Sequence, residues 1–178
     1  DHYAIDARLG TDEDFDWLIQ ECTARGINVM LDGVFNHVAR THPAVQQGLA
    51  GDTDWEGHGE LATLHHDEPQ VREMVTDIMC HWLRRGIAGW RLDVAYSVPS
   101  DFWADVLARV REQFPDAMFL GEVIHGDYAG IATAGTMDSV TQYELWKAIW
   151  SSLHDANFFE LDHALGRHRE IAQRVLPN

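Results

Sequence analysis

The sequence GWRLDVA at residues 89–95 places the strongest constraint on the fold of this chain. Residues 87–92 are apolar enough to form a short buried β-strand, and that strand ends on the carboxylate of Asp93. An amphipathic helix precedes the strand and ends near residues 84–86, and a second helix follows residues 99–101. Helices that alternate with strands ending in polar residues are typical of parallel α/β proteins, in which the chemistry gathers where the strands end.

The same unit of helix, strand and polar tip recurs along the chain. Thr11 is a favourable N-cap with Asp14 in the position of a capping-box acid, and the helix that they open ends at Arg25. An apolar strand over residues 27–31 then leads into the polar sequence DGVFNH at residues 32–37. We expect further strands over residues 118–120 and 137–141, and further helices that start at Pro69, that Ser100 caps, and that cover residues 128–133, 143–153 and 161–175.

Residues 38–66 form a long connection without clear periodicity. Connections of this length inside a compact domain are usually functional or disordered. The segment contains four histidines, which raises the question of a zinc site. Their spacing fits no helix-borne ligand pair, and the two cysteines lie elsewhere, so a polar loop that lines a cleft is the favoured interpretation. The four histidines are His42, His58, His65 and His66.

Three of the predicted strand tips carry acids, namely Asp32, Asp93 and Glu122. In a parallel barrel these tips share one end. A single Asp at a strand end is often only a loop cap, whereas two carboxylates facing one cleft can cleave a glycosidic bond. Arg91 lies two residues before Asp93, on the same side of the strand, where its charge would keep that carboxylate ionised. An acid in a more apolar pocket would stay protonated, as a general acid requires.

Three motifs match a known family in the right order and at barrel-compatible spacing. The sequences DGVFNH at residues 32–37, GWRLD at residues 89–93 and GEV at residues 121–123 resemble the first three conserved regions of the alpha-amylase family, glycoside hydrolase family 13. Weaker likeness at residues 4–11 and within residues 55–72 extends the resemblance over nearly the whole chain. The resemblance implies a (β/α)8 barrel that acts on α-glucosidic linkages of starch- or maltooligosaccharide-like substrates, as a retaining hydrolase or a transglycosidase.

The resemblance also implies a role for each functional residue of these motifs. Asp93 would be the nucleophile that forms a glycosyl-enzyme, and Glu122 would be the general acid/base. Arg91 would orient Asp93, and His37 would bond the sugar in the cleaved subsite.

Two further residues of the first motif are implied to have supporting roles. Asp32 would be mainly structural and would tie the first motif to its neighbours. Asn36 is a calcium ligand in many relatives, although the connection that follows it is short here. A loop cap is the alternative interpretation, because the side chain of Asn suits turns. We therefore expect no cofactor and no metal site, with calcium at Asn36 as the open alternative.

The chain departs from the family pattern in two ways. Many relatives carry Lys-His after the nucleophile, whereas Tyr96 and Ser97 stand in those places, which leaves open the acceptor specificity and the balance between hydrolysis and transfer. The fourth conserved region, a His-Asp pair after the seventh strand, does not occur before Asn178. We therefore predict that residues 1–178 are part of a catalytic domain, about strands three to six of a barrel of roughly 250 residues, with residues 38–66 in place of a short domain B.

Charge argues against nucleic acid and membranes as partners. The chain has 13 basic and 29 acidic side chains and a net charge of -16, whereas those partners call for a basic patch. No apolar run approaches the roughly 20 residues of a membrane span. The expected partners are an α-glucan or maltooligosaccharide substrate and either the missing barrel segments or a second copy of the chain, since open sheet edges invite pairing. We expect the isolated piece to be inactive.

Two other functions compete with this one. A catalytically inactive alpha-amylase-like barrel could serve binding or assembly, but it would need neither Asp93 nor Glu122. An unrelated metal-dependent barrel hydrolase could use His37, His42 and Asp93, with the histidines as ligands. Metal analysis would separate the metal-dependent hydrolase from the other two, and a covalent sugar label on Asp93 would separate the glycosidase from the inactive barrel.

The remaining sulfur and indole side chains are expected mostly in the core. Cys22 and Cys80 fall on predicted helices and are interpreted as small buried residues rather than as a bridge or a metal site. Trp55 and Trp90 are left unassigned. Five other tryptophans fall on predicted helices, which favours core packing over sugar platforms: Trp17, Trp82, Trp103, Trp146 and Trp150.

Overall fold

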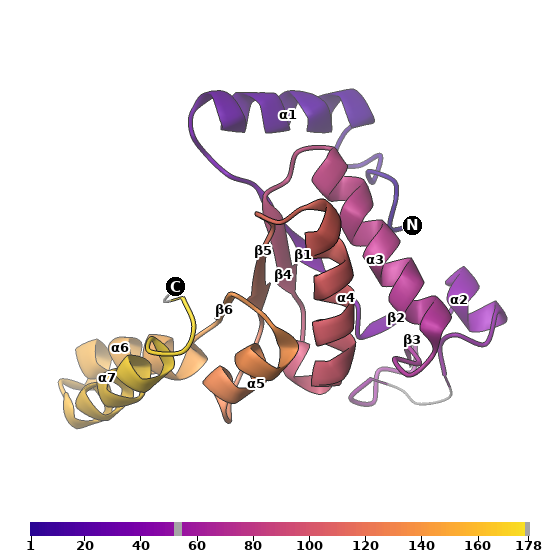
Figure 1. Cartoon of the computed structure of the whole chain (residues 1–178). Helices are drawn as coiled ribbons and strands as arrows, with labels where there is room; N and C mark the ends of the chain where they lie inside the picture. Colours follow the sequence, from indigo (N-terminus) through magenta and orange to yellow (C-terminus); the bar gives the residue numbers. More distant parts are fainter. Residues whose placement is uncertain (52–54, 177–178) are drawn as a thin grey trace.

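The computed structural model describes residues 1–51 and 55–176. Its centre is a four-stranded parallel sheet with the strand order β1-β4-β5-β6, so the predicted strands are parallel and adjacent in their order along the chain (Figure 1). This arrangement is the one expected for consecutive strands of a (β/α)8 barrel. The strands are β1 (Met30–Gly33), β4 (Gly89–Leu92), β5 (Met118–Gly121) and β6 (Ser139–Val140).

The register brings the predicted polar tips to one edge of the sheet. Gly33 pairs with Leu92, Leu92 with Gly121, and Gly121 with Val140. The residue after each of the last three strands also donates its backbone N–H to the neighbouring strand, as when the N–H of Glu122 bonds the carbonyl of Leu92 at 2.9 Å. The prediction that Asp32, Asp93 and Glu122 share one edge is therefore confirmed.

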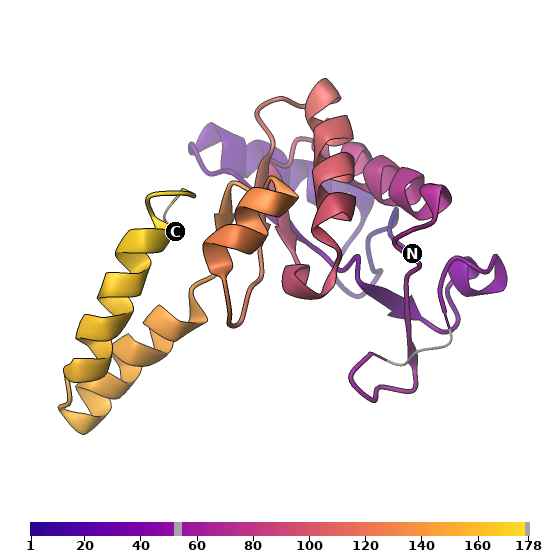
Figure 2. The ribbon, with the colours of Figure 1, turned by 60° about the horizontal axis from the view of Figure 1, so that its bottom comes forward.

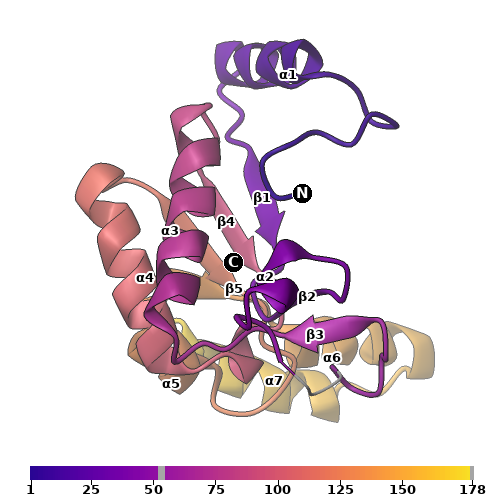
Figure 3. The same ribbon diagram turned by 90° about the vertical axis from the view of Figure 1, so that its right-hand side faces the viewer.

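Helices α3 and α4 lie side by side on one face of the sheet (Figures 1 and 3). Their apolar faces supply much of the core, and Val75, Met79, Phe102 and Trp103 are buried with Phe119 of the sheet in one cluster. Among the described residues every helix is too short or too polar to cross a bilayer. The longer helices are α1 (Asp12–Ala24), α3 (Pro69–Arg84), α4 (Ser100–Gln113), α5 (Tyr128–Gly135), α6 (Tyr143–Asp155) and α7 (Phe159–Ile171).

The predicted helix starts are mostly confirmed. Thr11 and Asp14 form the capping box, in which the N–H of Thr11 donates to Oδ2 of Asp14 at 2.8 Å and the N–H of Asp14 donates to Oγ1 of Thr11 at 3.2 Å. Pro69 is the first residue of α3, as expected. Ser100 is not an N-cap, because the extended Pro99 occupies that position and Ser100 is already the first helical residue.

Three strands begin later than predicted. Ile87 is not in β4, because its N–H bonds the carbonyl of Trp82 near the end of α3 at 3.5 Å. Ile27 is not in β1, because its N–H closes the end of α1 on the carbonyl of Cys22 at 2.9 Å. Strand β6 contains only Ser139 and Val140, because the N–H of Met137 is still bonded to the carbonyl of Ala132 in α5. Local helix-closing bonds therefore take residues that an apolar pattern alone assigns to the strands.

The connection after β1 is more ordered than its sequence indicates. It contains an antiparallel pair, β2 (His37–Ala39) with β3 (Leu61–Thr63), and the short helix α2 (Pro43–Gln46). These elements lie beyond the carboxyl end of β1 (Figure 3). Strands of three residues are too short to produce a recognisable alternation, which is why the sequence shows no clear periodicity here. Residues 52–54 of this connection lie outside the described residues.

Helices α6 and α7 form a hairpin that projects from the end of the sheet (Figure 2). The apolar residues Trp146, Ile149, Trp150 and Leu153 occur at helical spacing on α6, yet all four are exposed. Trp17 on α1 is also exposed, so core packing was the wrong expectation for three tryptophans. Trp150 stacks on the ring of His154, which also lies on α6, with centroids 5.0 Å apart.

Of the other side chains expected in the core, Cys80 and two tryptophans are buried. Trp82 and Trp103 are buried, and so is the unassigned Trp90. Neither cysteine forms a disulfide: Cys80 is buried and Cys22 is half-buried. Cys80, Trp82 and Trp103 belong to the main apolar cluster of the core, together with Trp90 of β4.

Candidate active site

One arginine holds three carboxylates together at the carboxyl end of the sheet. Nη1 of Arg91 lies 2.6 Å from Oδ1 of Asp32 and 2.8 Å from Oδ1 of Asp93. Its Nη2 lies 2.5 Å from Oε1 of Glu122. The strand register explains the gathering, because Asp32 pairs directly with Arg91 and the two other acids follow the ends of β4 and β5. Four of the sequence-predicted site residues therefore form one cluster.

Glu122 is buried and has donors on both carboxylate oxygens. Its Oε1 accepts from the hydroxyl of Tyr143 at 2.8 Å, and its Oε2 accepts from the backbone N–H of Val94 at 3.0 Å. Val94 has a left-handed backbone with φ of 40°, which a β-branched residue adopts only under constraint from its surroundings. Val94 follows Asp93 directly, so the backbone next to Asp93 helps to hold the carboxylate of Glu122.

The pKa values of Asp93 and Glu122 shift in directions opposite to those expected from the sequence. Burial raises the pKa of Asp93, and Arg91 only partly offsets this effect. Burial also works to raise the pKa of Glu122, but the Val94 N–H, the Tyr143 hydroxyl and Arg91 together lower it below its usual value. The expectation assigned Arg91 to Asp93 alone, whereas the arginine is shared among three carboxylates and Glu122 has two further donors.

His37 lies beside two residues that fix its ring. Nδ2 of Asn36 lies 3.2 Å from Nδ1 of His37, and the indole of Trp55 stacks on the imidazole with centroids 5.7 Å apart and planes 16° apart. Burial lowers the pKa of His37, and the nearby charge of Asp93 opposes that change. A neutral imidazole whose Nδ1 accepts from Asn36 carries its proton on Nε2, which is then free to donate to a ligand.

The side chain of Asn36 is buried against His37, and the backbone carbonyl of Asn36 accepts from the backbone N–H of Leu64 at 3.0 Å. Within residues 1–51 and 55–176, no three His, Cys, Asp or Glu side chains are grouped as metal ligands. Calcium at Asn36 stays an untested prediction, and no step below depends on it.

The other histidines of the connection after β1 have local partners. Nδ1 of His42 accepts from the N–H of Ala44 at 3.2 Å and caps α2. His65 contacts the carbonyl of Gly48, and the buried His66 contacts the carbonyl of Phe35, both at 3.0 Å. These contacts give each ring a structural role in holding the connection.

Sequence reasoning missed three contributors, namely Tyr143, Val94 and Trp55. Tyr143 was only the predicted start of a helix, although its place directly after the fourth strand tip was a usable signal. Nothing in the sequence marks Val94 for a left-handed backbone. The segments that follow Asp93 and Glu122 also contact each other. Tyr96 lies three residues after Asp93 and His125 three residues after Glu122, and the centroids of their rings are 5.8 Å apart.

Comparison with known proteins agrees with this geometry. The family model for the alpha amylase catalytic domain matches residues 1–57 and 54–165. The chain is 31% identical to neopullulanase 2 of Thermoactinomyces vulgaris over 168 residues, which are 80% of this chain and 28% of that protein. It is also 31% identical to a cyclomaltodextrinase of a Bacillus species, over 84% of this chain and 31% of that protein. The chain thus spans about a third of the length of these relatives.

Solved structures show the same backbone. An alpha-amylase from Geobacillus thermoleovorans, complexed with acarbose, superposes with a TM-score of 0.84 at 28% identity, over 98% of this chain and 44% of that chain. A cyclic alpha-maltosyl-(1→6)-maltose hydrolase from Arthrobacter globiformis gives 0.85 at 25% identity, over 98% of this chain and 45% of that chain. The chain therefore belongs to the alpha-amylase family, glycoside hydrolase family 13, and forms part of its catalytic (β/α)8 barrel.

Proposed function

We propose that residues 1–178 carry the nucleophile and the acid/base of a retaining glycoside hydrolase or transglycosidase. Its substrates are α-glucosidic linkages in starch- or maltooligosaccharide-like molecules. The observation that carries the proposal is the single guanidinium of Arg91 that contacts both Asp93 and Glu122. Two carboxyl groups bridged by one guanidinium lie close together, which supports the spacing of about 5–5.5 Å of a retaining pair rather than about 6.5–9.5 Å of an inverting one.

In the first half of the reaction a carboxylate oxygen of Asp93 attacks the anomeric carbon. Glu122 gives its proton to the glycosidic oxygen, and the bond from that oxygen to the anomeric carbon breaks. In the second half the ionised Glu122 takes a proton from water or from an acceptor hydroxyl. That oxygen attacks the anomeric carbon and releases Asp93.

The neighbouring residues support these two steps. Arg91 orients Asp93, and the Nε2–H of His37 bonds a hydroxyl of the sugar that becomes attached. Asp32 shares Arg91 with the reacting acids and so ties the first motif to the site. The names of the relatives, a neopullulanase and a cyclomaltodextrinase, support an α-glucan substrate. Residues 38–66 stand in the place of a short domain B in this proposal.

The stereochemical outcome tests the proposal. The full-length enzyme that contains this sequence should release product with the α configuration first, because two displacements restore the starting configuration. Proton NMR of the anomeric signals during the first minutes of maltooligosaccharide cleavage measures this outcome. Early appearance of the β-anomer would contradict a retaining pair, and absence of any turnover would favour the inactive barrel.

A second expectation concerns residues 1–178 in isolation. The apolar stripe of α6 is exposed, and a hollow of about 570 Å³ lined by apolar residues, including Leu31 and Trp90, flanks β1. Such surfaces favour association. The isolated chain should therefore associate. It should also show no turnover, because it forms only part of the catalytic barrel, and the loss of a single preorganised stabilising group from an active site can lower the rate by about 10²–10³-fold. Light scattering and an activated α-glucoside assay check this, and a monomer whose activity requires Asp93 would refute it.

A further inference from the structure

The three groups that contact the Glu122 carboxyl are not chemically equivalent. Nη2 of Arg91 and the hydroxyl of Tyr143 both reach Oε1, whereas the N–H of Val94 reaches Oε2. A guanidinium and a backbone N–H can only donate hydrogen bonds, but a phenolic hydroxyl can donate or accept. When Glu122 is protonated, Tyr143 is therefore the one of these three that can accept a hydrogen bond from it.

The fold fixes the position of Tyr143 on the sheet side. Tyr143 is the first residue of α6, two residues after Thr141 at the end of β6. Oγ1 of Thr141 accepts from the N–H of Val123 at 2.9 Å and donates to the carbonyl of Val123 at 3.0 Å. We call this pair of hydrogen bonds the Thr141 clamp. Because Val123 follows Glu122 directly, the clamp fixes the segment just before Tyr143 against the segment just after Glu122.

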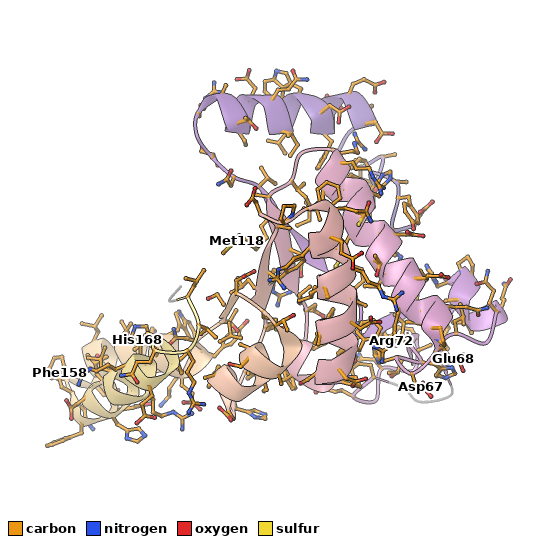
Figure 4. The ribbon with its side chains drawn as sticks, in the orientation of Figure 1. Asp67, Glu68, Arg72, Met118, Phe158 and His168 are labelled. Carbon is orange, nitrogen blue, oxygen red and sulfur yellow. The ribbon has the colours of Figure 1, made fainter. Side chains whose placement is uncertain are left out.

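Helix α7 holds the residues on either side of Tyr143. Nδ1 of His168 lies 2.8 Å from Oε1 of Gln142, and Nε of Arg167 lies 3.0 Å from Oε2 of Glu144. Figure 4 shows His168 on α7, within the hairpin that α7 forms with α6. The phenol is thus positioned from both sides, although its own ring is partly exposed.

We infer that Tyr143 is a positioning residue for the acid/base: it keeps the Glu122 carboxyl aligned in both protonation states and sets the pH at which Glu122 releases its proton. This inference rests on the proposed function. The hydrogen bond raises the pKa of Tyr143, with burial adding to the effect. Burial works to raise the pKa of Glu122 as well, and the Tyr143 hydroxyl is among the groups that lower it. Both directions are those of a hydroxyl that donates to a carboxylate.

The substitution Tyr143→Phe in the full-length enzyme tests the inference, because it removes one oxygen and keeps the ring. Without this donor the pKa of Glu122 should rise. Glu122 must be protonated to donate to the leaving group, so the alkaline limb of the pH profile of kcat/KM should move to higher pH. Side-chain carboxyl ¹³C NMR should show the same upward shift for Glu122, whose signal is identified by its loss in Glu122→Gln.

Two further variants make the result decisive. Tyr3→Phe removes the hydroxyl of a tyrosine whose ring packs edge-on against that of His81 on α3, with centroids 5.2 Å apart, and it should leave the titration of Glu122 unchanged. Thr141→Val removes the clamp but keeps the phenol, and it should shift the titration upward by less than Tyr143→Phe. An unchanged Glu122 titration in Tyr143→Phe, or an equal shift in Tyr3→Phe, would overturn the inference. The NMR titration does not require turnover, so it separates this failure from a failure of the proposed function.

Discussion

Replacing Asp93 by asparagine in the full-length enzyme is expected to lower kcat on maltooligosaccharides by about 10⁴–10⁶-fold. An amide oxygen is a poor nucleophile, so the glycosyl-enzyme cannot form at a useful rate. The loss should come from chemistry rather than from unfolding. Arg91 keeps Asp32 and Glu122 as partners, and burial disfavours the charge that the substitution removes.

Steady-state kinetics together with a thermal melt of each variant measure this effect. Asp101→Asn is the matched control, because Asp101 also pairs with an arginine, Arg72 at 2.9 Å, but lies at the start of α4 with its side chain 77% exposed. Its kcat should stay within a few-fold of the wild type. If Asp93→Asn retained more than about a hundredth of the wild-type kcat, Asp93 would not be the nucleophile.

Replacing Glu122 by glutamine should have an effect that depends on the leaving group. General acid catalysis contributes about 10²–10⁴-fold, and a sugar leaving group needs the whole of it. A leaving group that departs as a stable anion needs almost no proton donation from a general acid. Maltooligosaccharides should therefore be cleaved about 10²–10⁴-fold more slowly by Glu122→Gln, whereas the formation of the glycosyl-enzyme from an activated α-glucosyl fluoride should change little.

Rapid-mixing assays with the two substrate types make this comparison. Glu21→Gln is the matched control, since Glu21 also pairs with an arginine, Arg25, but lies on α1 with its side chain 41% exposed. It should slow neither substrate by more than a few-fold. Equal losses on both substrate types for Glu122→Gln would contradict the acid/base role.

Strand order and strand-tip chemistry could be predicted from the sequence because both depend on local patterns. Apolar runs that end on a polar residue identify the strands, and parallel strands necessarily bring their carboxyl ends to one edge. Asp32, Arg91, Asp93 and Glu122 meet for this reason. The capping box at Thr11 was equally readable, since it depends on two residues three positions apart.

The parts that could not be predicted depend on contacts that are distant in sequence. Burial raises the pKa of Asp93 although Arg91 lies beside it. Both this burial and the sharing of Arg91 among three acids are visible only once β1, β4 and β5 are side by side. Tyr143 reaches Glu122 across 21 positions of the sequence. The exposure of Trp146 and Trp150 was missed because helical spacing identifies an apolar face but not what covers it.

The most direct test of the account is to identify the residue that becomes glycosylated. The full-length enzyme is treated with an activated α-configured fluorosugar that traps the glycosyl-enzyme, digested, and analysed by peptide mass spectrometry. We predict one added sugar on the peptide that contains Asp93, and no added sugar in Asp93→Asn. A sugar attached to Glu122 or to any other residue, or an active enzyme that accumulates no labelled peptide, would contradict this prediction.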